Sequence, residues 1–561
     1  MGFWKEAVGM LALVVLLGGC GGGAGDSDAG SETSGGGTGS SVPAAQADYT
    51  LLAWNDLGMH CLDSDYAVFS LLPPYNVLNA QLVRRGAGRI VSGVTLTYEP
   101  VTDARGSINS TSRGKTNFWD YAESLYGVRL GPDEGLKGFS MPSNGPAAMR
   151  FDAAHEWFTA EGIPITPYDD EGRKNEYPMM RVKARDASGR VLATADVVLP
   201  VSDEMTCVRC HGSAQGVEAA RPSGGWVNEA DPERDWRLNI LRLHDEKEGG
   251  GRKFREALAT LGLDPRGLEA SARSGRPVLC AGCHRSNALP GTGLAGIAQL
   301  TTAIHDRHAR VTDPDTGYRL DEDPTRTACY LCHPGSTTQC LRGAMGKATD
   351  SAGNQRMQCQ DCHGNLSAVG RDSREGWLDM PNCQACHRDG ERHTRAVDAQ
   401  GRPLDATDRR FATNPDTPAP GLSLYRFSRG HGGVQCEGCH GSTHAIYPSA
   451  EANDNVLSER LQGYAGTVRE CAVCHDPVPY TVDGGPHGMH TIGAAWVYGH
   501  GDWVERNGPG ACAYCHGADF RGSPLAVVKA AKQFRAEHRT VGYVPDQPVT
   551  CYDCHDGPYE D

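Results

Sequence analysis

Residues 359–387 read CQDCHGNLSAVGRDSREGWLDMPNCQACH and contain the pattern Cys-x-x-Cys-His at both ends. The sequence between the two copies leaves little room for a strand or a long helix. Paired cysteines of this kind can be a zinc ribbon, two disulfides, or an attachment site for c-type haem, in which two thiols bond the vinyl groups and the adjacent histidine ligates the iron. The histidine distinguishes these three cases.

The pattern recurs nine times along the chain, and a histidine follows the second cysteine every time. Neither a zinc ribbon nor a disulfide framework requires a histidine at that place. We therefore interpret the motifs as attachment sites for nine covalent c-type haems. The predicted attachment residues are Cys207, Cys210, Cys280, Cys283, Cys329, Cys332, Cys359, Cys362, Cys383, Cys386, Cys436, Cys439, Cys471, Cys474, Cys512, Cys515, Cys551 and Cys554. The predicted proximal iron ligands are His211, His284, His333, His363, His387, His440, His475, His516 and His555.

Composition agrees with this interpretation. The chain has 561 residues and a net charge of −15, which argues against nucleic acid or an anionic membrane surface as an electrostatic partner. Only 7% of the residues are aromatic and 71 are glycine, so a conventional apolar core is thin. The haem groups would supply the missing core.

The N-terminus has the features of an exported lipoprotein. Residues 7–17, AVGMLALVVLL, are too few to span a bilayer and precede Leu17-Gly18-Gly19-Cys20, which is similar to a bacterial lipobox. We predict a signal peptide over 1–19, lipidation of Cys20, and a Gly/Ser-rich tether through residue 47 with a reach of roughly 30 Å. The glycine after Cys20 resembles the outer-membrane sorting signal, which predicts an outer-membrane lipoprotein facing the cell surface or the periplasm.

Two folded domains are expected after the tether. Residues 48–202 contain no motif and read as short alternating strands, for example GVTLTYEPV, in which Val94, Leu96 and Tyr98 share one face. We expect a β-sandwich-like domain with a docking or scaffold role. Residues 203–561 are expected to form a loop-rich, sparsely α-helical multihaem cytochrome c domain, so the fold class is multidomain.

Three segments predict helices because an apolar stripe at helical spacing ends in histidine: 235–246, 296–309 and 525–538. Twelve histidines lie outside the motifs, enough for a second ligand at every iron. Bis-histidine ligation would keep the reduction potentials low. The predicted distal ligands are His244, His305, His308, His393, His431, His444, His490, His500 and His538, with His487 as the alternative to His490.

Cys61 and Cys340 are left without a motif, and in an oxidising compartment an even remainder suggests a disulfide. Such a bond would bring His60 within range of an iron as a further distal candidate, although a structural role is favoured for His60 and for His155. The acidic turn at 169–172 could bind Ca²⁺, but a solvated hairpin turn accounts for it better.

The lipobox, the nine motifs and the phrases HGMH…WV…H and CEGCHGSTH resemble the multihaem (nonahaem) c-type cytochrome lipoproteins on the outer surface of dissimilatory metal-reducing bacteria. The resemblance implies electron relay across or at the outer membrane to extracellular acceptors such as metal oxides, metal ions and other cytochromes. It also implies redox partners, namely periplasmic or outer-membrane cytochromes and porin–cytochrome conduits, and no catalytic residues.

Two alternatives remain open at this stage. A multihaem reductase of the nitrite, hydroxylamine or tetrathionate type carries one open haem, often marked by lysine in place of the motif histidine, and no CxxCK occurs here. A self-assembled cytochrome filament would need subunits that stack head to tail, which the lipid anchor opposes.

Overall fold

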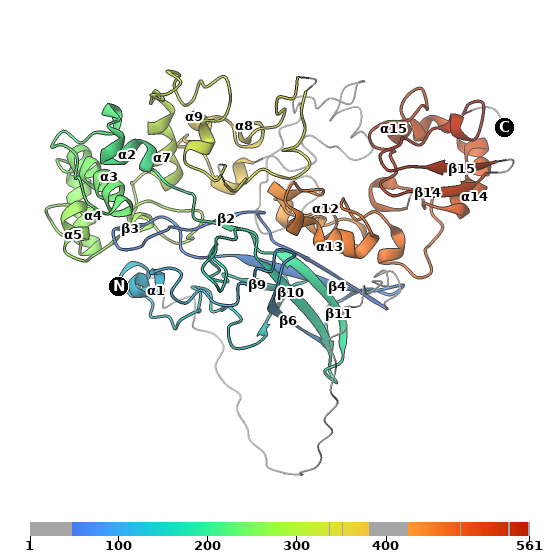
Figure 1. Ribbon diagram of the computed structural model, residues 1–561, viewed down its shortest axis with the longest axis horizontal. Coiled ribbons are helices and arrows are strands. Elements are labelled where there is room, and N and C mark those ends of the chain that lie inside the picture. Colours follow the sequence, from blue (N-terminus) through green and yellow to red (C-terminus); the bar gives the residue numbers. More distant parts are fainter. Residues whose placement is uncertain are drawn as a thin grey trace, which may run out of the picture.

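The computed structural model describes residues 48–335, 337–350, 352–380, 424–482, 484–536 and 539–558. The strands of the N-terminal part lie together, and the short helices of the remainder form an arc over them, from α3–α5 at one end to α14 and α15 at the other (Figure 1). No helix of the described residues is long and apolar enough to cross a membrane.

The first antiparallel sheet has the strand order β1-β4-β9-β8, with β5 paired to β4. Its strands are β1 (Tyr49–Trp54), β4 (Val77–Arg84), β5 (Gly88–Ile90), β8 (Arg150–Asp152) and β9 (Trp157–Glu161). In β1, Leu51 and Leu52 point to opposite faces and are both buried. A strand buried on both faces must be covered on both, and here the second sheet and the C-terminal region supply the two covers.

The second antiparallel sheet has the order β11-β10-β6-β7. Its strands are β6 (Val94–Val101), β7 (Ala147–Ala148), β10 (Met179–Asp186) and β11 (Val191–Val198). Leu96 and Tyr98 alternate with exposed or half-buried residues and enter the same core as the first sheet, with Val94 at its edge. The expectation of a strand-rich N-terminal region with antiparallel sheets is therefore confirmed.

Helices are sparse, short and mostly beyond residue 203. The α-helices among the described residues are α1 (Phe118–Tyr126), α2 (Val208–His211), α3 (Pro232–Glu248), α4 (Arg252–Leu261), α5 (Leu268–Arg273), α6 (Cys280–Cys283), α7 (Leu300–Ala309), α8 (Cys359–His363), α9 (Leu366–Val369), α12 (Cys436–His440), α13 (Ala452–Gln462), α14 (Ala494–Asn507) and α15 (Ala513–His516). The helix predicted at 235–246 is confirmed as α3. Of the helix predicted at 296–309, residues 300–309 form α7, and residues 296–299 precede it, with Gln299 at the N-cap. In α3, Asp231 caps the first turn and Pro232 takes the first helical position, as expected for a helix start.

The helix predicted at 525–538 is wrong. This segment contributes β14 (Lys532–Arg535), which forms an antiparallel hairpin with β15 (Thr540–Tyr543). Phe534 lies opposite Val541, and its ring is 6.1 Å from that of Tyr543. Cross-strand packing of this aromatic residue outweighs the helical propensity of the alanines and lysines before it.

The strand-rich part and the remainder are packed into each other. Leu457 and Leu461 of α13, together with Val473, belong to the core between the two sheets. One short parallel pairing also binds the parts together, that of β3 (Phe69–Ser70) with β13 (Val278–Leu279), whereas β2 (His60–Cys61) pairs with β12 (Val201–Ser202) within the strand-rich part. The predicted boundary at 202/203 thus marks where the Cys-x-x-Cys-His motifs begin, but side chains from both sides of it pack into one core.

The apolar core is unevenly distributed. Four clusters of buried apolar side chains are found among the described residues, and none of them includes a residue beyond Cys474. The 14-residue helix α14 buries no side chain at all, although it carries two tryptophans and a tyrosine. Among the described residues beyond Cys474, the buried apolar side chains, such as Phe520, Val528 and Tyr543, belong to none of these clusters.

Candidate haem-binding sites

Each of the eight described motifs forms a single helical turn. In five of them the motif histidine donates its backbone N–H to the carbonyl of the first cysteine at 2.9–3.0 Å, as His211 does to Cys207. One turn brings residues i, i+3 and i+4 to one side, so both thiols and the imidazole face the same space. That arrangement suits attachment of one macrocycle. The ninth motif, beginning at Cys383, lies outside the described residues, as do Cys20 and His393.

Every described motif histidine lies beside a second histidine from elsewhere in the chain, with ring centroids 5.7–6.4 Å apart. The pairs, each with the motif histidine first, are His211–His308, His284–His244, His333–His305, His363–His444, His440–His487, His475–His431, His516–His490 and His555–His500. No histidine occurs in two pairs. Two imidazoles that ligate one metal ion from opposite sides have centroids about 6 Å apart, because each metal–nitrogen bond is about 2 Å.

The hydrogen bonds of these histidines fix which ring nitrogen is available. In seven of the sixteen, Nδ1 lies 2.7–3.1 Å from a backbone carbonyl oxygen, as between His305 and Thr301. A carbonyl only accepts, so Nδ1 carries the proton and Nε2 keeps its lone pair. Metal-ligating histidines are oriented in this way. The residues present therefore fit c-type haem at these eight sites.

Burial keeps many of these imidazoles neutral, as ligation requires. It lowers the pKa of His211 and His333 to about 4 and that of His363 to about 3, and the positive charge of each partner histidine acts in the same direction. His444 is the exception. Burial would lower its pKa, but the Cys340 thiol and the Leu57 carbonyl raise it.

Most of the predicted distal histidines occupy such pairs. His244, His305, His308, His431, His444, His490 and His500 each face a motif histidine, and His393 and His538 lie outside the described residues. His487 and His490 were alternatives in the sequence, yet both are paired, with different motifs. The backbone of His487 is left-handed, with φ 57°.

The two histidines of the strand-rich part have other partners. The His60 ring is hydrogen-bonded to Asp56 at 3.2 Å and lies beside Tyr75. His155 is hydrogen-bonded to Asp152 at 2.7 Å and stacks between two aromatic rings. Among the described residues neither ring is paired with a motif histidine, in keeping with structural roles.

The predicted bond between Cys61 and Cys340 is not formed. Both are free thiols in the structure. Burial raises the pKa of Cys340, but a hydrogen bond with His444 and the charge of that ring lower it overall.

The paired histidines link neighbouring sites into a sequence. His305 and His308, one turn apart on α7, serve the third and first motifs. His444 follows the sixth motif by four residues but faces the fourth, and His487 and His490 face the sixth and eighth.

Cysteines of different motifs also approach each other closely enough to interact electrostatically. These contacts join Cys280 to Cys207, Cys439 to Cys474 and Cys551 to Cys512. In Figure 1 the motif helices α2, α8, α12 and α15, which belong to the first, fourth, sixth and eighth motifs, follow one another along the arc.

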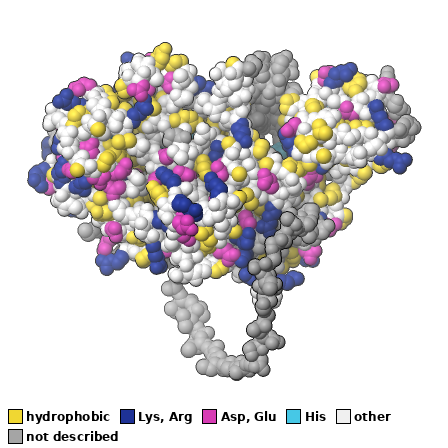
Figure 2. Space-filling view, viewed as in Figure 1, with side chains coloured by type: hydrophobic (Ala, Val, Ile, Leu, Met, Phe, Trp, Pro, Cys, Tyr) yellow, Lys and Arg dark blue, Asp and Glu magenta, His cyan; other side chains and the backbone are white. Residues whose placement is uncertain are grey.

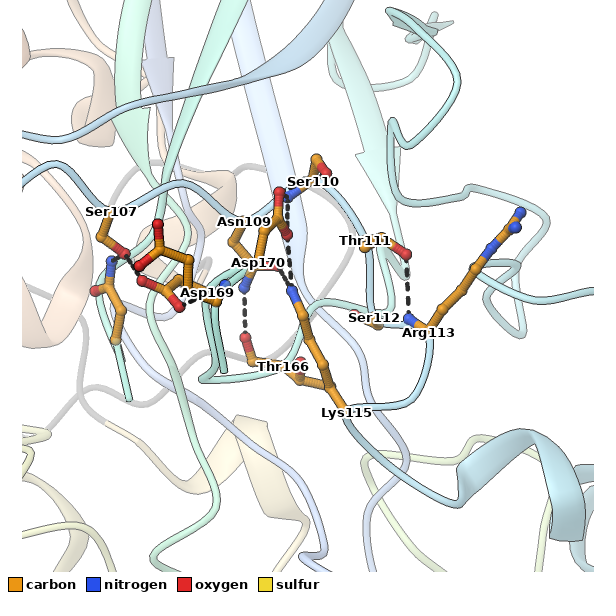
Figure 3. A network of polar contacts seen from close by, with 12 residues as sticks. Ser107, Asn109, Ser110, Thr111, Ser112, Arg113, Lys115, Thr166, Asp169 and Asp170 are labelled. Carbon is orange, nitrogen blue, oxygen red and sulfur yellow. Dashed lines mark hydrogen bonds and ion pairs between the residues drawn. The ribbon is translucent and has the colours of Figure 1, made fainter. Parts of the chain in front are cut away.

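The acidic turn at 169–172 is occupied by the protein's own cations and hydroxyls (Figure 3). Asp169 accepts from Arg173 and Ser107, and Asp170 accepts from Lys115 and Ser110. The Asp169 side chain is 1% exposed, but residues 170–172 are exposed, so the expectation of a solvated hairpin turn holds for most of this turn. Its carboxylates are already neutralised, which leaves Ca²⁺ no advantage there.

No group of three or more His, Cys, Asp or Glu side chains among the described residues could hold a metal ion by itself. The ligand sets of zinc ribbons are therefore not assembled in the part of the chain that the structure describes. No family model matches the chain, and no curated protein or solved structure matches it either.

Proposed function

We propose that this chain is a multihaem c-type cytochrome that relays electrons at the outer membrane to extracellular acceptors such as metal oxides, metal ions or other cytochromes. The observation that carries the proposal is the set of eight histidine pairs at ligation distance, one for each described motif. The Cys-x-x-Cys-His spacing accounts for the position of each motif histidine. It does not account for the second histidine at nearly the same distance from each of them, which a group bound between the two rings explains.

The chain's own residues would hold nine haems, each through two thioethers and two imidazoles. When bound, the haem supplies one-electron redox chemistry at its iron. The motif cysteines would attach each haem covalently, the paired histidines would ligate its iron, and backbone carbonyls hold imidazoles by accepting a hydrogen bond from Nδ1. Two nitrogen ligands favour a low potential, which suits transfer rather than oxygen binding.

The order of the sites supports relay over long distance. Neighbouring sites share an element, as the first and third share α7, so their spacing is fixed by local structure rather than by flexible loops. Basic and acidic side chains are interspersed on the face shown in Figure 2, and the net charge is −15, which suits redox protein partners better than nucleic acid. Lipidation at Cys20 would place the body at the membrane, facing the cell surface or the periplasm, beside periplasmic or outer-membrane cytochromes and porin–cytochrome conduits.

The reductase alternative requires an iron with one free axial position. Each motif histidine among the described residues has a partner ring, which argues against an open position at these eight sites; the fifth motif, Cys383–His387, lies outside the described residues. Nothing described here favours the filament alternative.

The test is low-temperature electron paramagnetic resonance (EPR) of the oxidised, haem-loaded protein, together with its intact mass. Relay predicts nine haems by mass and only low-spin ferric signals. Mass without haem would overturn the proposal. A high-spin signal equal to one haem would favour the reductase, and it should then respond to nitrite or hydroxylamine. His490→Ala is the matched control, because it opens one site deliberately.

A further inference from the structure

Trp496 contacts the second histidine of two different haem sites. Its indole is stacked on the His490 ring with centroids 4.1 Å apart and planes inclined by 10°. One turn further along α14, the His500 ring lies 5.8 Å away, and its Nδ1 donates to the Trp496 carbonyl at 3.1 Å. His490 faces the eighth motif and His500 the ninth.

The ring planes at these two sites differ. At the eighth site the planes of His490 and His516 are inclined by 12°, whereas at the ninth those of His500 and His555 are inclined by 63°. Only two other described pairs are close to parallel, at 13° and 30°, and the remaining four are inclined by 56–79°. Near-parallel planes thus occur at three of the eight described sites, and at the eighth site a third flat ring, that of Trp496, lies against the second histidine.

Trp496 restrains the ring of His490. A flat indole stacked on an imidazole blocks rotation of the ring about its own side-chain bonds, since rotation would drive the ring edge into the indole face. The Nδ1 of His490 also donates to the Thr491 carbonyl at 2.9 Å, so the ring is held from two directions.

Core packing does not account for this tryptophan. The helix α14 buries no side chain, and Trp496 is half-buried. Its ring contacts are with His490, with His500 and with Tyr480, whose side chain is largely exposed.

We infer that Trp496 is a positioning residue for electron transfer between the eighth and ninth sites: it holds the imidazole planes of the eighth site parallel and ties that site to helix α14, which carries His500. The inference rests on the proposed function. The indole itself is neither oxidised nor reduced, because it acts only through the orientation of His490.

EPR of the oxidised protein tests this directly. In a low-spin ferric haem with two imidazoles, parallel planes give a rhombic signal and perpendicular planes give a highly anisotropic one. Trp496→Leu should shift one haem equivalent from the rhombic to the anisotropic class, with the haem count unchanged. Trp496→Phe, which keeps a flat ring, should retain the wild-type spectrum. Trp503→Leu, on the same helix, is the matched control and should also leave it unchanged.

The outcomes separate this inference from the proposed function. If the wild type binds no haem or is high spin, the proposed function fails. If the wild type is fully low spin and Trp496→Leu has its spectrum, the positioning role is wrong. If Trp496→Leu loses haem, Trp496→Met, which fills the space without a flat face, decides: an unchanged rhombic signal overturns the inference, and a shifted one supports it.

Discussion

Removing the charge of Arg342 should destabilise the protein strongly, because this side chain joins the strand-rich part to the haem-site region in a buried setting. Its guanidinium donates to both carboxylate oxygens of Asp454, at 2.7 and 2.8 Å, and to the carbonyl of Gly58. It also lies 4.9 Å from the centre of the Tyr177 ring. The exposed fractions of the two charged side chains are 1% and 3%.

The expected magnitude follows from that burial. Arg342→Met leaves the Asp454 carboxylate buried without its cation, and removing one partner of a buried ion pair costs about 3–5 kcal/mol. The double variant Arg342→Met/Asp454→Leu removes both charges and should recover most of the loss, since apolar replacement of a whole pair is often close to neutral. At the surface pair Arg129–Glu123, with 83% and 62% exposure, the same change should cost below about 1 kcal/mol.

The assay is unfolding of haem-loaded protein in guanidinium chloride, followed by circular dichroism in the haem Soret band and in the far ultraviolet. The free energies of unfolding of wild type, Arg342→Met, the double variant and Arg129→Met are compared. Equal effects of Arg342→Met and Arg129→Met would refute the reasoning. So would a double variant no more stable than Arg342→Met.

Three further outcomes are expected. His305→Ala and His308→Ala should each convert one haem to high spin by EPR, and the double variant two; a single converted haem in the double variant would contradict the pairing on α7. Burial raises the pKa of Asp63 to about 6, above the roughly 3.9 of an unfolded carboxyl, so the folded state binds the proton more tightly and the free energy of unfolding should fall as pH rises across that interval. Asp63→Asn should abolish this fall in urea titrations, and an unchanged slope would count against it. Haem-free protein should lose residues 476–558 to protease before the strand-rich part, because no described apolar cluster holds them; simultaneous cleavage by mass spectrometry would contradict this.

The spacing of apolar residues predicted a helix or strand correctly where the residues of that element alone determine its conformation. The alternation of Leu96 and Tyr98 predicted a strand with one buried face, and the stripe ending in His244 predicted α3. The same reasoning failed at 525–538, where the stripe through Phe534 became a strand. A helical pattern over a few residues does not indicate whether a neighbouring strand is available for pairing. Here the pairing strand, β15, follows later in the chain.

Prediction from the sequence was also incomplete for the histidines that pair with the motif histidines. Sequence identified most of the histidines that face a motif, because few others are available, but it treated His487 and His490 as alternatives. The backbone conformation that lets both serve, with φ 57° at His487, has no reliable sequence signal beyond the surrounding glycines.

The sequence by itself determined the local geometry of each candidate attachment motif, because two cysteines and a histidine within five residues need only one helical turn to face the same space. Only the tertiary structure decided which second histidine meets which motif. His363 meets His444 and His211 meets His308, across long stretches of chain, because β13 pairing with β3 and α13 packing into the sheets fix where each helix and loop lies. Ligand identity is thus a local property of the chain, whereas the order of the sites depends on how distant segments pack.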